Sequence, residues 1–141
     1  MKKRIAFMLV CLLVVSCIGF SSGYCMVATR PEQSNPQYTL TKSTWASLSI
    51  SATGKATCTG YIRASSSDST IDITVKLMQK NGTTWKRYDS WSTTNVKGAV
   101  ELVKTCAVEP GTYKVTVIGT VKSIAGKKET VSVSSGEKTY P

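Results

Sequence analysis

The sequence contains no histidine, and this absence removes several kinds of chemistry. Ser-His-Asp and Cys-His nucleophile systems both need an imidazole as the general base. Zinc sites are usually built from histidine and closely spaced cysteine pairs, and neither occurs here. Phosphate-binding loops of the GxxxxGK or GxGxxG type are missing too. We therefore expect no metal, no cofactor and a non-catalytic role.

Acidic residues are few, with 8 Asp and Glu against 18 Lys and Arg. A hydrolase that works with two carboxylates would need them about 5 to 9.5 Å apart across a cleft. Asp72 and Asp89 could approach one another across a predicted hairpin. However, Asp72 falls on the polar face of its strand, where a solvated charge is the simpler interpretation. A carboxylate-dependent hydrolase is kept as the weaker alternative.

Long apolar runs are absent except near the N-terminus. Basic residues 2–4 precede an apolar stretch of 16 residues (5–20), and small residues follow it. This order is typical of a secretory signal peptide, and 16 residues are fewer than the roughly 20 that a spanning helix needs. We expect residues 1–25 to be a signal peptide and the protein to be secreted.

The exit of this segment leaves three alternatives open: a cut before Tyr24, a cut before Met26 and lipidation of Cys17. Val14-Val15-Ser16-Cys17 loosely fits a lipobox, and lipidation of Cys17 would anchor the protein on the outer face of the cell membrane. The apolar run continues past Cys17, which argues against lipidation. Ordinary cleavage before Met26 is favoured because it leaves Cys58 and Cys106 as the only cysteines, with no odd thiol. Since disulfides persist outside the cytoplasm, we predict a Cys58–Cys106 disulfide, with two buried thiols as the alternative.

The mature chain is basic. Loss of residues 1–25 leaves 15 basic and 8 acidic residues, a net charge of +7. This excess favours anionic partners such as lipid headgroups, wall polymers or nucleic acid, and secretion argues against nucleic acid. The lysines are scattered along the chain, so a basic surface without a specific ligand is the alternative interpretation.

Short strands with frequent turns are predicted for most of the mature chain. Residues 26–44 carry two prolines and no periodicity, which indicates a flexible leader. Residues 45–141 are expected to form one all-β domain, an antiparallel sandwich of six to seven strands. The predicted strands are 45–52, 55–64, 71–80, 83–91, 98–108, 113–122 and 129–135, with the last residues, GEKTYP, fraying.

Clean alternation of apolar and polar residues marks two of these strands. It gives segments 71–80 and 113–122 one buried and one solvated face. The expected buried residues are Ile71, Ile73, Val75, Leu77, Tyr113, Val115, Val117 and Val121. Asn81-Gly82 predicts a type I′ turn, in which both central residues have positive φ. Residues 83–91 should therefore run back antiparallel to 71–80.

The segment EPGTYKVTVIGTV (109–121) resembles a corner of immunoglobulin-like and fibronectin-like sandwiches, where a Pro-Gly turn and a tyrosine open a core strand. The resemblance implies a sandwich that is immunoglobulin-like in style. Cys106 precedes Tyr113, whereas an antibody-type domain has its second cysteine just after the tyrosine. As a whole, the chain resembles small secreted Ser/Thr-rich β proteins of Gram-positive bacteria, which implies an extracellular location.

Clustered aromatic residues supply the candidate binding site. In a regular strand, Trp85, Arg87 and Trp91 would share one face with Asp89, and Tyr88 would lie on the other. Aromatic and ionic groups together suit a cell-wall glycan or another anionic polymer, although large aromatics also pack into cores. We therefore expect a secreted binding or interaction domain at the bacterial surface or in the medium. The alternative is a basic, membrane-active or antagonistic secreted protein.

Overall fold

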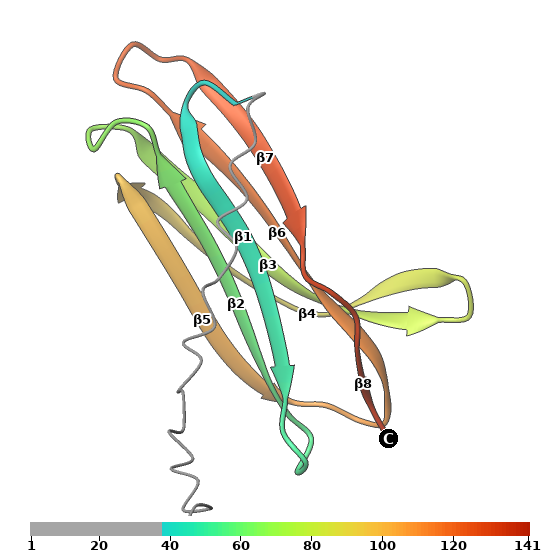
Figure 1. Cartoon of the computed structure of the whole chain (residues 1–141). Coiled ribbons are helices and arrows are strands. Elements are labelled where there is room, and N and C mark those ends of the chain that lie inside the picture. Colours follow the sequence, from blue (N-terminus) through green and yellow to red (C-terminus); the bar gives the residue numbers. More distant parts are fainter. Residues whose placement is uncertain (1–37) are drawn as a thin grey trace, which may run out of the picture. The chain divides into compact units, whose positions relative to one another are not determined.

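The computed structural model describes residues 38–141, and this part of the chain contains strands and no helix (Figure 1). Eight strands form two antiparallel sheets, so the expected all-β sandwich is confirmed, with one strand more than expected. The predicted signal peptide, residues 1–25, lies outside the described residues, as does most of the predicted leader, 26–44. Between residues 38 and 141 no helix is long and apolar enough to cross a membrane.

The first sheet has three strands in the order β1-β2-β5. The inward residues of this sheet include Leu48, Cys58 and Ile62, which are at most 5% exposed. Serine, threonine and tyrosine dominate its outer side, as the alternation predicts. The strands are β1 (Thr41–Ile50), β2 (Lys55–Ala64) and β5 (Ala99–Ala107).

The second sheet has the order β4-β3-β6-β7, and the short strand β8 pairs with the start of β6. In antibody constant domains the fourth strand joins the sheet of the first strand, whereas here β4 pairs with β3. The chain passes from β4 to β5 through Gly98, whose φ is 71°. The strands are β3 (Thr70–Asn81), β4 (Thr84–Lys97), β6 (Gly111–Lys122), β7 (Lys128–Ser134) and β8 (Lys138–Tyr140).

Several predicted boundaries are wrong, among them the end of the fourth strand, which is predicted at residue 91 and lies at Lys97. β1 begins at Thr41, inside the predicted leader. The residues just before it are bound to β7: Glu129 Oε2 accepts hydrogen bonds from the backbone N–H groups of Thr39 (2.7 Å) and Leu40 (3.1 Å). The C-terminal residues do not all fray, since β8 pairs with β6. In the β3–β4 hairpin, Asn81 pairs with Thr84, so the loop is Gly82-Thr83, and of these two residues only Gly82 has positive φ, 62°. Positive φ at the first central residue alone fits a type II′ turn.

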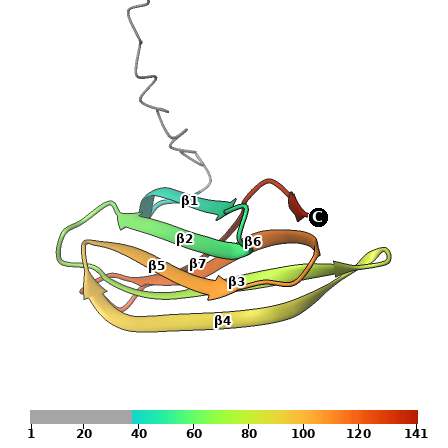
Figure 2. The ribbon, with the colours of Figure 1, turned by 90° about the horizontal axis from the view of Figure 1, so that it is seen from below.

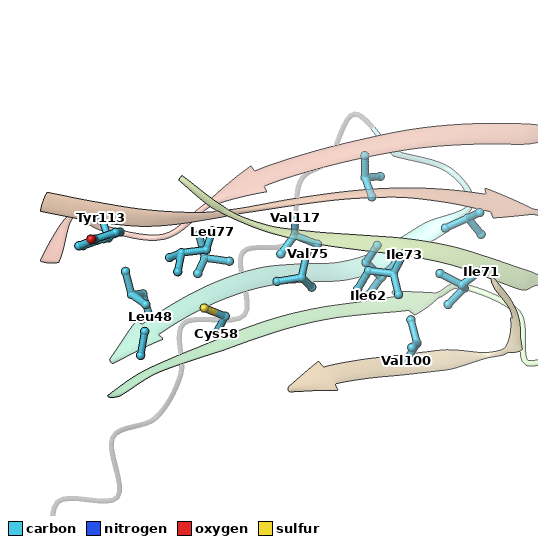
Figure 3. Close-up of a cluster of buried hydrophobic side chains, with 14 of the residues drawn as sticks. Leu48, Cys58, Ile62, Ile71, Ile73, Val75, Leu77, Val100, Tyr113 and Val117 are labelled. Carbon is cyan, nitrogen blue, oxygen red and sulfur yellow. The ribbon is translucent and has the colours of Figure 1, made fainter. Parts of the chain in front are cut away.

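The core lies between the two sheets (Figure 3). All eight residues expected to face inward from 71–80 and 113–122 are buried, at 1% exposure or less. Glycines let the sheets approach: a Cβ at Gly60 would lie 2.6 Å from Val75 Cγ2. At the predicted corner, the Tyr113 hydroxyl donates a hydrogen bond to the Glu109 carbonyl (2.8 Å), the contact that gives the tyrosine corner of such sandwiches its name.

Candidate functional site

A β-bulge in β4 separates the predicted site residues. Leu77 pairs with Asp89 but Met78 pairs with Arg87, so Tyr88 is an extra residue without a partner in β3. A bulge of this kind re-aims the side chains that follow it. The expected single face of Trp85, Arg87, Asp89 and Trp91 is therefore wrong.

Trp85 and Arg87 face outward on the second sheet. Trp85 pairs with Lys80, and Arg87 with Met78, both on the solvated side of β3. Beyond the bulge, Trp91 lies opposite the buried Val75 and packs against the core. The structure brings Trp85 and Arg87 together and places Trp91 elsewhere.

Tyr88 has a structural position of its own. Its ring meets the Tyr113 ring edge-on, with centroids 5.4 Å apart and planes at 90°. Its hydroxyl donates to the Ala107 carbonyl oxygen, 3.3 Å away, at the end of β5. Tyr113 in turn accepts a hydrogen bond from Gln79 Nε2 (3.0 Å). Burial, followed by the neighbouring Tyr88, raises the pKa of Tyr113. Tyr88 thus connects the edge strands of the two sheets.

Two lysines hold the Trp85 indole on the outer face. Lys114 Nζ lies 4.3 Å from the centroid of the ring, and Lys80 Nζ lies 5.6 Å from it. Cations at such distances are attracted to the negative face of the indole. Lys80 also forms an ion pair with Glu137 (3.3 Å). Lys114 reaches the site because β6 pairs with β3, where Met78 lies opposite it.

These side chains form a basic surface on the β3–β4 hairpin and the start of β6. We call it the Trp85 surface. Arg87 is exposed, and neither its side chain nor that of Lys76 forms a hydrogen bond or ion pair among residues 38–141. The hairpin extends beyond the neighbouring strands (Figures 1 and 2), so its outer face is open to a large partner. The Trp85 surface consists of Lys76, Lys80, Trp85, Arg87 and Lys114.

Sequence reasoning found Trp85 and Arg87 but missed their lysine neighbours. Lys80 could have been found, because any tight hairpin at Asn81-Gly82 places it near Trp85. Lys114 is 29 positions from Trp85 in the sequence, and only the pairing of β3 with β6 joins them. No local pattern carries that information.

The two carboxylates considered for hydrolysis lie on opposite faces of the second sheet. Asp72 faces outward, accepts a hydrogen bond from the Asn95 N–H (2.9 Å) and forms an ion pair with Lys122 (2.5 Å). The Lys122 hydrogen bond, followed by that of Asn95, lowers the pKa of Asp72. Asp89 faces inward opposite Leu77 and accepts a hydrogen bond from the Ser90 N–H (2.7 Å). These two groups do not flank a common cleft.

Cys58 and Cys106 are free thiols, so the predicted disulfide is not formed. They lie on neighbouring strands, but Cys58 pairs with Lys104 and Cys106 with Ala56, which makes the two cysteines diagonal neighbours. Diagonal residues in a sheet are about 7–8 Å apart, too far for a disulfide without backbone movement. Among residues 38–141, no three potential metal ligands gather at one point.

Comparisons with known proteins leave the family open. No model of a known protein family matches the sequence, and no curated protein matches it either.

Proposed function

We propose that this protein is a secreted, non-catalytic binding domain that takes an anionic glycan or wall polymer on the Trp85 surface. The observation that carries the proposal is an outward-facing tryptophan with two lysine ammonium groups near its ring, on the same face as an exposed arginine without a charged partner. The indole offers an apolar plane for a sugar ring, and the cations attract the charges of the polymer. Arg87 supplies the planar fork that suits carboxylate, sulfate or phosphate groups.

A polymer fits this surface better than a lipid bilayer does. Insertion into a bilayer needs exposed apolar side chains next to the basic ones. In the described part of the chain, the exposed large hydrophobic residues are Tyr88, Val103 and Ile124. None of them belongs to the Trp85 surface. The membrane-active alternative therefore has less support than polymer binding.

The proposed location follows from residues outside the described part. The basic start and the short apolar run of residues 1–25 favour secretion after a cut before Met26. Lipidation at Cys17 is the alternative and would keep the same surface outside the cell. Either location brings a basic domain next to anionic wall polymers.

Binding to a charged and a neutral polysaccharide tests the proposal. We expect the mature protein to bind dextran sulfate and isolated Gram-positive cell walls, and to ignore neutral dextran. Trp85→Ala should weaken binding about tenfold. In nucleic-acid-binding proteins, a base that stacks on an aromatic side chain contributes roughly 1–3 kcal/mol, and we expect a similar contribution from a sugar ring on Trp85. Arg87→Gln should weaken it several-fold.

The matched control is Lys127→Gln, which removes the same charge from an exposed turn outside the surface. It should change affinity less than twofold. Equal losses for Arg87→Gln and Lys127→Gln, together with unchanged binding by Trp85→Ala, would show that net charge alone drives the interaction. Association with anionic vesicles that matches binding to walls would favour the membrane-active alternative instead.

A further inference from the structure

A second basic site lies at the end of the sandwich opposite the hairpin. An open hollow of about 430 Å³ forms where β1 begins, β2 ends and β5 begins. Its position is set by the loop between β2 and β3 and by the Gly98 corner. The lining residues are Lys42, Arg63, Ala64, Ser65, Ser67, Gly98 and Ala99.

A bulge in β1 contributes one of the two cations. Thr41 pairs with Ala64 and Ser43 pairs with Arg63, so Lys42 is the extra residue between them. Both Lys42 and Arg63 are exposed and line the same hollow. In a regular strand Lys42 would lie opposite a residue of β2. In the bulge it has no such partner, and its side chain lines the hollow instead.

Small residues and firm backbone contacts keep the hollow open. The Ala64 N–H donates to the Gly98 carbonyl (2.8 Å), and the Gly98 N–H donates to the Ser69 carbonyl (2.9 Å). A Cβ at Gly98 would lie 3.3 Å from the Ser67 carbonyl oxygen, and its φ of 71° also favours glycine. Apart from Lys42 and Arg63, the lining residues are Gly98, alanines and serines, so no other large side chain enters the space.

The electrostatics of the hollow favour an anion. No acidic residue lines it, and Asp68, on the same loop, is not part of the lining. Within residues 38–141, neither Lys42 nor Arg63 forms an ion pair, and the hydroxyls of Ser65 and Ser67 form no hydrogen bond. Two cations and two serine hydroxyl groups thus line one hollow that has no anionic residue in its lining.

We propose that this hollow binds one tetrahedral oxyanion, a phosphate or sulfate group carried free or as a monoester. Arg63 would hold two oxygens through its planar guanidinium, and Lys42 would supply a mobile point charge. The serine hydroxyls would donate to the remaining oxygens. The hollow lies near the start of β3, at Thr70, and the hairpin tip lies at its end, at Asn81. At about 3.3 Å per residue, the two are roughly 35 Å apart. The proposal therefore stands independently of the Trp85 surface.

Amide chemical shifts of the mature, isotope-labelled protein test this proposal. Inorganic phosphate and glycerol 3-phosphate are added in separate titrations, with sodium chloride keeping the ionic strength constant. We expect saturable shifts at the amides of Ser65, Ser67 and Gly98, with half-saturation in the millimolar range. If glycerol 3-phosphate binds more tightly than inorganic phosphate, the natural ligand is a phosphate monoester. If the two bind equally, the hollow recognises only the phosphate group.

Charge-removing variants decide whether the hollow is the site. Arg63→Gln should weaken binding at least fivefold, and Lys42→Gln at least twofold. Lys55→Gln, which removes the same charge at the opposite end of β2, should leave the titration unchanged. All three side chains are exposed, so the variants should keep the wild-type spectrum. Shifts that grow linearly without saturation, or that survive unchanged in Arg63→Gln, would overturn the proposal.

Discussion

The two cysteines differ in their surroundings although they lie on neighbouring strands. Cys58 is fully buried, and burial, together with the nearby Cys106 and Asp89, raises its pKa to about 12. Cys106 is only partly buried and lines a hollow of about 350 Å³ with residues of the β1–β2 turn. Burial, then Asp89, raises its pKa as well. Since the thiolate is the reactive form, both thiols should react slowly, and Cys58 the more slowly of the two.

We predict that iodoacetamide modifies Cys106 in the native protein at least tenfold faster than Cys58. Peptide mapping of the protein at pH 8 measures the two rates. In urea the two thiols should react alike, which provides the control for intrinsic reactivity. If neither thiol reacts until a reductant is added, the cysteines are joined in a disulfide and the free-thiol arrangement is wrong.

At the scale of the elements, the packing of the two sheets depends on glycines in their facing strands. A Cβ at Gly119 of β6 would overlap Ile62 Cδ1 of β2 and lie 3.1 Å from the Asp72 carbonyl oxygen. Ile62 is fully buried and has little room to move. Extra atoms in a closely packed core force neighbouring side chains out of their preferred rotamers.

Gly119→Ala should therefore lower the free energy of unfolding by about 1–3 kcal/mol. Urea denaturation followed by tryptophan fluorescence measures the change. Gly136→Ala is the matched control, because nothing lies within 4 Å of a Cβ at that position. Equal stability of the two variants would mean that the sheets are not held as closely as the structure indicates.

The same elements show how far the sequence predicts this fold. Alternation located β3 and β6 and their buried faces, because one side of each strand meets the core and the other meets water. It could not locate the bulge at Tyr88, since the residues of β4 do not alternate clearly between apolar and polar and therefore give no sign of an extra residue. Misplacing that one residue turned Trp91 to the wrong face, as any register error of one residue does.

Contacts between distant segments were the other limit. The pairing of β3 with β6 and the short β8 depend on how the chain folds back, and local propensity says nothing of either. The candidate site was accordingly half predictable: Trp85 and Arg87 come from one strand, whereas Lys114 comes from another. The cysteines illustrate the same limit, because two cysteines on neighbouring strands can form a disulfide only in the right register.

At the scale of the whole molecule, the absence of histidine shapes the dependence of stability on pH. No side chain has an ordinary pKa between 5 and 8. On the acid side, Asp72 and Glu129 both have lowered pKa values. Burial alone would raise the pKa of Glu129, but hydrogen bonds from the residues at the start of β1 outweigh it. On the alkaline side, burial raises the pKa of Cys58 and of Tyr113.

A lowered carboxylate pKa adds stability above its unfolded value and loses it as the pH falls through the folded one. A raised thiol or phenol pKa adds stability below its unfolded value and loses it as the pH rises toward the folded one. We therefore predict nearly constant stability between about pH 5 and 8, with a decline below pH 4 from Asp72 and Glu129 and above pH 9 from Cys58 and Tyr113.

Urea denaturation from pH 3 to 10 measures this profile, and two variants assign its acid limb. Asp72→Asn removes the ion pair with Lys122, and Glu129→Gln removes the charged acceptor that ties Thr39 and Leu40 to β7. Each should lower stability at pH 7 and flatten the loss below pH 4, because the group whose protonation causes that loss is gone. Asp68→Asn, in an exposed loop, should do neither. A wild-type profile that falls steadily between pH 8 and 5 would contradict this prediction, because no side chain of the sequence has its ordinary pKa in that range.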